Sequence, residues 1–263
     1  MFLNEPQPTP YDLHFELFGF PVRISPYFWL MALIMGSSAG GTLILIWGLV
    51  LFVSILIHEL GHAFAMRHFG RPARIVLTMM GGLAIEDNGS DAWGNFRSSS
   101  KPRTTYEQVV ICFAGPLAGF CLAALVCVVV ILLKGRVQVE MVRWRWLSFP
   151  DVEAVLPMHL ARNDNLRFFV RQMLFVNIFW GIINLFPVFP LDGGQIGRAL
   201  FVRQDPWRGI EKSLWLSVFT GATLAVFGLI AMESMYMGML FGSLAIGSYQ
   251  QLAQMGGGQR GGW

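Results

Sequence analysis

The segment Ile57-His58-Glu59-Leu60-Gly61-His62-Ala63 places two histidines one helical turn apart, with a glutamate between them. On a helix, side chains four residues apart project from the same face, so His58 and His62 can each offer an imidazole nitrogen to one zinc ion. Glu59 then lies beside the metal without having to bind it, where a general base for a metal-activated water belongs. The pattern predicts a zinc site with Glu59 as its catalytic residue.

The position of this motif in the chain argues against two ordinary core histidines. The motif closes an uncharged run that extends from Thr42 to Ile57. One ionised carboxylate in such a run costs about 2.5 to 3.5 kcal/mol on membrane-insertion scales. Packing alone gives no reason to bear that cost, so metal binding is favoured.

A catalytic zinc commonly has three protein ligands and keeps its fourth position for water, so a third ligand must come from elsewhere in the chain. Asp192 is the best candidate, because it follows Pro187 and Pro190 and precedes Gly193-Gly194. An irregular backbone of this kind is tolerated at membrane depth where it lines a cavity. We expect Asp192 to complete the site with the two histidines.

The composition indicates that these residues are carried by membrane helices. The chain has 263 residues, of which 54% are apolar and only 13% charged, and its mean hydropathy is +0.54. Runs of about 20 apolar residues cross a hydrocarbon core of about 30 Å. We predict a membrane all-α fold of about six transmembrane helices with a small membrane-associated β-sheet. The segments cover approximately residues 26–37, 41–67, 107–133, 167–187, 213–232 and 235–254.

Three shorter segments have patterns other than that of a membrane helix. Residues 11–25 alternate polar and apolar side chains and predict a short hairpin, on which Asp12, His14 and Glu16 share a face. A solvated strand face is favoured there over a metal site. The segment from Ile75 to Ile85 is rich in β-forming residues, with paired glycines that suggest a bend. Residues 143–146 interleave arginine with tryptophan and are interpreted as an interfacial loop.

We expect one transmembrane domain over residues 1–255 and a disordered, glycine-rich tail over residues 256–263. The prolines and acidic residues near the N-terminus do not fit a removable signal peptide. The net charge of +3 is spread over many loops and does not indicate a nucleic-acid partner. Arginine and lysine favour a multi-pass protein of the cytoplasmic membrane, with its N-terminus and active site toward the cytoplasm.

The motifs resemble those of the site-2 protease family of intramembrane zinc metalloproteases. The match rests on the histidine motif and on the later Asn184-x-x-Pro-x-x-Pro-Leu-Asp-Gly-Gly, and it extends to Met80-Gly81-Gly82 and Ala114-Gly115-Pro116-Leu117. The resemblance implies that Asp192 completes the zinc site. It also implies regulated intramembrane proteolysis, in which membrane-anchored proteins are cut within the lipid bilayer, and a β-rich segment that offers its edge to an unwound substrate.

Asn184 matches a family asparagine that binds substrate or stabilises the reaction intermediate, and its amide suits a developing oxyanion. A hydrogen bond between helices of the bundle is the alternative, and both interpretations stay open. Many relatives carry a PDZ domain between the two metal motifs or a nucleotide-sensing CBS pair. Neither is expected in this chain, because the link between the third and fourth segments is short.

A non-proteolytic zinc-binding scaffold or a metal transporter is the competing function. A transporter would favour several intramembrane acidic or histidine ligands along a path, whereas here the intramembrane polar groups gather at one level. The sequence does not indicate an oligomeric state.

Overall fold

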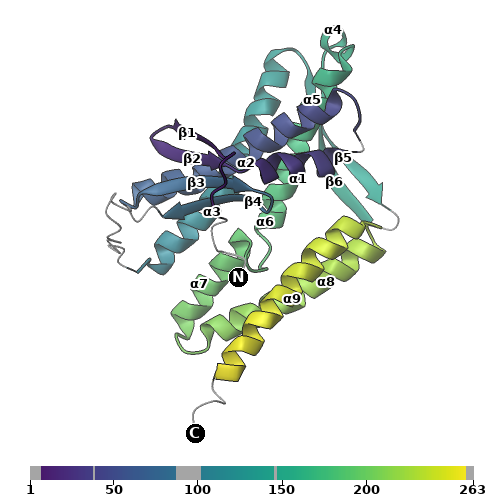
Figure 1. Cartoon of the computed structure of the whole chain (residues 1–263). Helices are drawn as coiled ribbons and strands as arrows, with labels where there is room; N and C mark the ends of the chain where they lie inside the picture. The colour runs from purple at the N-terminus through teal and green to yellow at the C-terminus, as the bar shows by residue number, and fades with distance from the viewer. Residues whose placement is uncertain (1–6, 38, 87–101, 145–146, 259–263) are drawn as a thin grey trace. The chain divides into compact units, whose positions relative to one another are not determined.

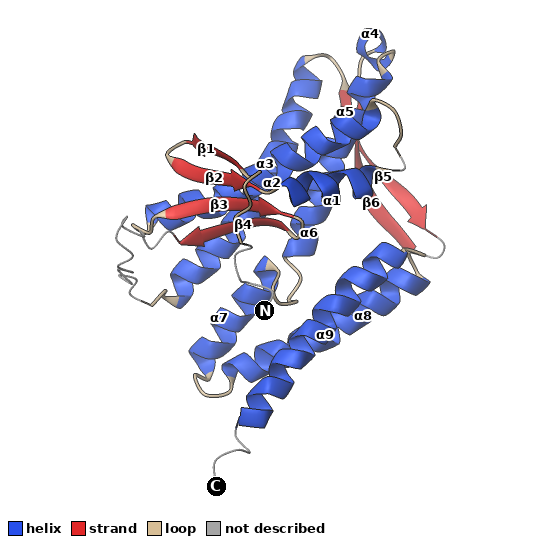
Figure 2. Cartoon of the chain, in the orientation of Figure 1, coloured by secondary structure: helices blue, strands red, loops and turns tan. Residues whose placement is uncertain are grey.

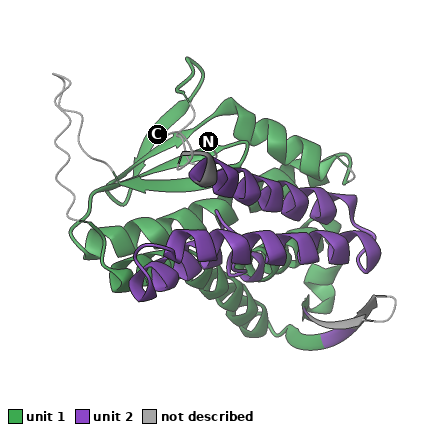
Figure 3. Ribbon diagram, turned by 90° about the horizontal axis from the view of Figure 1, so that it is seen from below, with its two compact units in different colours: residues 1, 3–139, 152–181 green, residues 2, 140–151, 182–263 purple. Residues whose placement is uncertain are grey.

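The computed structural model describes residues 7–37, 39–86, 102–144 and 147–258. Helices make up most of the described chain, and two small β-sheets accompany them (Figures 1 and 2). The chain divides into two compact units (Figure 3). Residues 3–139 and 152–181 form the first, and residues 140–151 and 182–263 form the second.

Four helical stretches in the described residues are long and apolar enough to cross a membrane. One of them is built from three consecutive elements, α5 (Asp164–Phe175), the π-helical turn η1 (Val176–Trp180) and α6 (Gly181–Asn184). The predicted class, a helical multi-pass membrane protein with small sheets, is therefore confirmed. The other three spans are α2 (Leu43–His68), α3 (Thr105–Leu132) and α8 (Gly209–Ile230).

Two of the six predicted segments are not among these spans. The first is the helix α1 (Pro26–Gly36), whose 11 residues extend only about 16 Å at 1.5 Å per residue, too short for the hydrocarbon core. The last is α9 (Met235–Gly258), a long helix that carries glutamines in its second half. Helix α9 continues into the tail that was predicted to be disordered, and residues 259–263 lie outside the described chain.

The larger sheet combines both predicted β-segments in the order β1-β2-β3-β4. The strands are β1 (Leu13–Leu17), β2 (Phe20–Ile24), β3 (Ala73–Thr78) and β4 (Gly81–Glu86). The predicted N-terminal hairpin is confirmed as the antiparallel pair β1 and β2, while β2 and β3 run parallel with Val22 opposite Ile75. The bend between β3 and β4 is made by Met79-Met80, and Gly81 begins β4 with a φ of +111°, which only glycine adopts easily.

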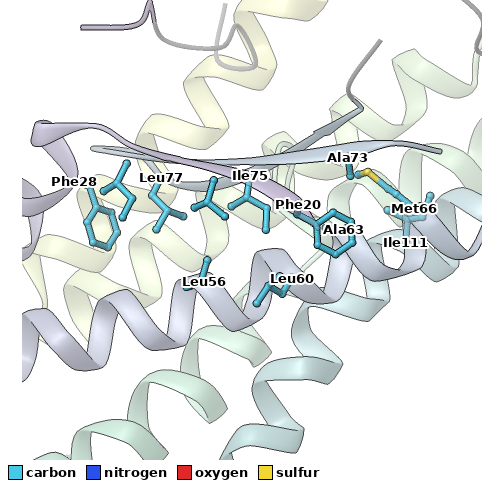
Figure 4. Packing of buried hydrophobic residues seen from close by; sticks show 12 residues of the cluster. Phe20, Phe28, Leu56, Leu60, Ala63, Met66, Ala73, Ile75, Leu77 and Ile111 are labelled. Carbon is cyan, nitrogen blue, oxygen red and sulfur yellow. The ribbon is translucent and has the colours of Figure 1, made fainter. Parts of the chain in front are cut away.

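A hydrophobic core joins this sheet to one face of α2 (Figure 4). Leu56, Leu60 and Ala63 of the helix face Ile75 and Leu77 of β3, and each of these side chains is buried. Close packing gives these side chains many van der Waals contacts, so the cluster holds the helix against the sheet. The packing leaves the face of α2 that carries the histidines free to meet another element.

The smaller sheet pairs β5 (Arg136–Trp144) with β6 (Leu147–Val155). The interpretation of residues 143–146 as an interfacial loop was therefore wrong at its start, because Arg143 and Trp144 belong to β5, while residues 145–146 lie outside the described chain. The segment Arg136-Val137-Gln138-Val139-Glu140-Met141 alternates polar and apolar residues, which is the period of a strand. The short helix α4 (Met158–Ala161) follows β6.

A buried polar contact ties α2 to the third span. Asn177 lies in the π-helical turn and is only 4% exposed. Its Nδ2 donates to Ser54 Oγ at 2.9 Å and to the Met173 carbonyl at 2.8 Å. Helices in lipid gain stability from such hydrogen bonds between them, so this contact fixes the position of the span beside α2.

An ionic cluster joins the end of α2, strand β4 and the start of α3. Arg71 donates to Glu86 Oε1 at 2.7 Å and to Glu107 Oε2 at 2.8 Å, and Arg103 donates to Glu86 Oε2 at 3.1 Å. Glu107 also forms a capping box with Thr104 at the start of α3. Burial raises the pKa of Glu86, but the hydrogen bond from Arg71 and the charge of Arg103 outweigh it and hold that pKa below its ordinary value.

Replacing Arg71 by methionine is expected to lower the free energy of unfolding by on the order of 1 to 2 kcal/mol, because two partly buried carboxylates each lose one of their donors. A lowered carboxyl pKa stabilises the fold above the ordinary pKa of 4.5. That contribution is lost as pH falls through the lowered value. Below pH 4.5 the wild type should therefore lose stability more steeply than the Arg71→Met variant, which thermal unfolding in detergent at several pH values measures.

The matched control is Arg167→Met, which removes an exposed pair with Asp164 whose side chains are 60% and 87% exposed. This variant should unfold within about 0.5 kcal/mol of the wild type at every pH. An equal effect of the two substitutions would contradict a special role for the Arg71 cluster.

Candidate metal centre

Helix α2 brings the two predicted histidine ligands together. The helix is unbroken from Leu43 to His68, so His58 and His62 lie on the same face. Their Nε2 atoms are 3.1 Å apart. With Glu59 they form a group of possible metal ligands whose donor atoms all lie within 4.8 Å of one another, the one such group among the residues that the structure describes.

The ring of His62 is oriented by α3. Its Nδ1 lies 2.7 Å from the backbone carbonyl of Ile111. A carbonyl oxygen only accepts hydrogen bonds, so Nδ1 carries a proton, and in the neutral imidazole Nε2 then keeps its lone pair. A histidine that ligates a metal typically donates its other ring N–H to a carboxylate or carbonyl in this way. The tautomer set by Ile111 is thus the one that a metal ligand needs.

The positions of these atoms fit zinc. Two nitrogens at 2.0 to 2.1 Å from one tetrahedral ion lie about 3.3 Å apart. The separation between His58 Nε2 and His62 Nε2 is 3.1 Å. Imidazole nitrogens and a carboxylate oxygen are also donors that zinc binds readily. Small movements of the two rings would therefore accommodate one ion.

Glu59 is buried against the backbone of strand β4. The residue is only 5% exposed. A Cβ atom added to Gly82 would lie 2.4 Å from Glu59 Cγ and 2.5 Å from its Oε1, closer than real Cβ contacts come. Glycine at position 82 therefore lets an edge strand of the sheet approach the carboxylate, which explains the place of Met80-Gly81-Gly82 among the motifs.

Asp192 and Asn184 belong to the second compact unit. Asp192 is the first residue of α7 (Asp192–Gln204) and is 8% exposed. Asn184 ends α6, just before the proline-containing loop. Their approach to the histidines of the first unit stays a prediction, and so do the two interpretations of Asn184.

Within the second unit, two serines bind the backbone of Phe189 in the loop before Asp192. The N–H of Phe189 donates to Ser217 Oγ of α8 at 3.0 Å, and Ser248 Oγ of α9 donates to the Phe189 carbonyl at 3.4 Å. A Cβ at Gly193 would lie 2.1 Å from the Leu185 carbonyl oxygen. The glycine thus allows the loop to fold back on the first turn of α7, and the two serines supply the partners that lipid cannot.

The three polar residues of the N-terminal hairpin differ in their surroundings. Asp12 forms an ion pair with Arg23 at 3.1 Å, and the side chain of Thr9 donates to Asp12 as well. His14 and Glu16 are exposed. The predicted solvated strand face is therefore confirmed for His14 and Glu16, whereas the side chain of Asp12 is buried in its ion pair.

Several residues that shape the site were missed from the sequence. Ile111 acts through its backbone carbonyl, for which no side-chain signal exists. Ser217 and Ser248 are single hydroxyls in long apolar helices, a pattern that fits many other roles. Gly82 and Gly115 stood in motifs that the resemblance pointed out, but nothing in the sequence said what each glycine contacts.

The chain is similar in sequence to known proteins. The model of peptidase family M50 matches residues 47–226. Zinc metalloprotease MJ0392 of Methanocaldococcus jannaschii is 27% identical over 228 residues, which is 83% of this chain and 54% of that protein. Stage IV sporulation protein FB of Bacillus subtilis is 26% identical over 195 residues, or 73% of this chain and 51% of that protein. The chain therefore spans about half the length of these two relatives.

The fold resembles that of a solved membrane protease. The structure of a site-2 protease from Methanocaldococcus jannaschii superimposes with a TM-score of 0.55 at 20% sequence identity. The likeness covers 92% of this chain and 95% of that one. At this identity the comparison shows a shared fold.

Substituting Gly82 by alanine should destabilise the protein by about 1 to 3 kcal/mol, because the new methyl group overlaps Glu59. A double-mutant cycle in detergent isolates this contact. In a Glu59→Ala background the overlapping atoms are gone, so Gly82→Ala should cost far less. An equal cost in both backgrounds would show that Gly82 does not contact Glu59.

Proposed function

The chain belongs to peptidase family M50, and we propose that it is an intramembrane zinc metalloprotease that hydrolyses peptide bonds of membrane-anchored proteins. The observation that carries the proposal is the group of His58, Glu59 and His62, whose donor atoms converge within a membrane-spanning helix. Family membership and the shared fold agree with the resemblance of the motifs to site-2 proteases. The name of one relative, a zinc metalloprotease, supports the choice of metal.

We assign His58 and His62 as two nitrogen ligands of the zinc and Asp192 as the third. When bound, zinc acidifies a water molecule and polarises the substrate carbonyl. The Ile111 carbonyl holds His62 in the tautomer that a ligand needs. Asp192 is supported by its place at the start of a helix, behind a loop in which two serines bind the backbone of Phe189. Three protein ligands leave one coordination position for the reacting groups.

Glu59 is assigned as the general base and then as the general acid. Its carboxylate accepts a proton from the attacking water and later delivers that proton to the leaving amine. Burial of Glu59 against Gly82 supports this role, because a carboxylate held in one place needs no reorganisation during the reaction. The side chain is adjacent to both ligand histidines and does not have to bind the metal itself.

Asn184 is proposed to donate its side-chain amide to the oxyanion that develops on the substrate carbonyl. The proposal is supported by Asn177, whose amide already makes a hydrogen bond between helices in the same span. Because Asn177 already supplies a hydrogen bond from this span to α2, Asn184 is not needed for the same structural purpose. The place of Asn184 immediately before the loop that leads to Asp192 also suits a role at the site.

Strand β4 is proposed to receive the substrate as an added strand. The order β1-β2-β3-β4 places β4 at one edge of the sheet, and its glycine Gly82 lies against Glu59. A peptide that pairs with this edge is extended, and an extended peptide exposes the carbonyl that a helix shields. The substrates therefore belong to the class of membrane-anchored proteins whose helices unwind locally.

The active site is proposed to lie toward the cytoplasm, with the N-terminus on the same side. Ten residues separate His58 from the last residue of α2, which places the site about 15 Å from that helix end. Arginines follow the helix in the next loop, as the positive-inside rule expects of a cytoplasmic side. A metal transporter is disfavoured, because the described residues contain a single group of possible metal ligands.

Glu59→Gln should retain about one zinc ion per chain and lose at least a hundredfold in cleavage rate, because the general base is removed while the ligands stay. Cleavage of a membrane-tethered reporter in lipid vesicles, with metal analysis of the same sample, measures both. The control Glu16→Gln changes an exposed glutamate of β1 and should cut at the wild-type rate. Wild-type activity of Glu59→Gln would remove Glu59 from the mechanism.

Asp192→Asn should weaken zinc affinity at least tenfold, because an amide oxygen is a poorer ligand than a carboxylate. Zinc affinity is measured by competition with a chelator of known strength. Asp205→Asn serves as the control, since Asp205 follows α7 and pairs with Lys212 at 2.8 Å. Unchanged affinity of the Asp192 variant would exclude it as the third ligand.

A further inference from the structure

We propose that Gly115 of α3 is a positioning residue of the metal centre, whose missing side chain lets His58 and His62 hold their nitrogens where one ion can bind both. The inference rests on the zinc site of the proposed function. It adds a second element, α3, to the structures that determine the geometry of the ligands carried by α2.

Helices α2 and α3 are in backbone contact at this level, so moving α3 away would open their close packing. A Cβ atom added to Gly61 of α2 would lie 2.4 Å from the Ala114 carbonyl oxygen and 2.9 Å from Ala118 Cβ. A glycine on α2 is therefore in contact with the backbone of α3 at the level of the histidines. The distance between the helices at this level is set by backbone contact, which cannot yield as a side chain would.

Gly115 stands directly against both ligand nitrogens. A Cβ atom at this position would lie 2.3 Å from His62 Nε2 and 2.8 Å from His58 Nε2. The same atom would lie 2.4 Å from His62 Cε1. A methyl group therefore overlaps the edge of one imidazole and crowds the other. It can be accommodated only if the rings turn away or the close contact between α2 and α3 opens.

The ring of His62 is not free to turn. Its Nδ1 is bound to the Ile111 carbonyl at 2.7 Å, and Ile111 lies one helical turn before Gly115 on the same face of α3. Rotation of the ring breaks this hydrogen bond and releases the tautomer that leaves Nε2 available. Two successive turns of α3 thus position the imidazole: Ile111 binds its Nδ1, and Gly115 leaves room for its Nε2.

The next turn of α3 supplies a matched comparison. Gly119 follows Gly115 by four residues, and a Cβ there would meet the Asn177 backbone oxygen at 3.4 Å and its Oδ1 at 3.5 Å. These are ordinary van der Waals distances. Alanine at position 119 should therefore be tolerated, and its better helix propensity should offset any small cost.

The test compares Gly115→Ala with Gly119→Ala in the full chain, purified in detergent. Zinc affinity is measured by chelator competition, and the visible absorption of the cobalt-loaded protein reports the geometry of the ligands. Gly115→Ala should bind zinc at least tenfold more weakly and change the cobalt spectrum. Gly119→Ala should match the wild type in both. Wild-type zinc affinity and an unchanged spectrum in Gly115→Ala would overturn the proposal.

Thermal unfolding of the metal-free protein separates a local contact from a general packing defect. In a His62→Ala background the main clash is removed, so Gly115→Ala should cost much less stability there than in the wild-type background. An equal loss, or failure to fold in both backgrounds, would assign Gly115 to helix packing and overturn the proposal. A wild-type chain that binds no zinc would instead refute the proposed function, and the unfolding comparison would still test the contact with His62.

Discussion

The hydrogen bond between His62 Nδ1 and the Ile111 carbonyl is the interaction on which the metal centre depends. It fixes the ring and its tautomer, so that the lone pair of Nε2 faces the second histidine. The bond exists because α2 and α3 pack at backbone distance, with Gly61 against Ala114. On its other face α2 is held by the core that it shares with the sheet. Helix α2, which carries both ligand histidines, is thus packed between α3 and the sheet.

The membrane explains why the remaining polar groups are arranged as they are. Lipid offers no hydrogen-bond partners, so each buried backbone or side-chain group must find one in the protein. Asn177 and Ser54 pair inside the first unit, and Ser217 and Ser248 satisfy the Phe189 peptide inside the second. Charged groups outside the spans pair with one another. Arg71 forms ion pairs with two carboxylates, those of Glu86 and Glu107, where the helices leave the apolar region.

Periodicity in the sequence predicted the elements well where one interaction dominates. The alternation over residues 11–25 and the apolar runs of the long spans were enough for the hairpin and the helices, because alternation has the period of a strand and a run of about 20 apolar residues is long enough to cross a bilayer. Periodicity failed where the length of a helix or the pairing of a strand decides the outcome. Residues 26–36 are apolar but form a helix too short to cross the bilayer, and the strand ending at Trp144 was mistaken for a loop because its charged residues resemble an interface.

The sequence by itself determined that His58, Glu59 and His62 lie close together, because they are about one turn apart on a helix and helical geometry alone brings their side chains near one another. Tertiary structure decided everything that depends on a second element. The tautomer of His62 is chosen by a backbone carbonyl, and the space around the site is set by Gly82 and Gly115. The sequence shows that Gly82 and Gly115 have no side chain. Only the packed structure shows which atoms occupy the space that a side chain would fill, namely those of Glu59 at Gly82 and of the two histidines at Gly115.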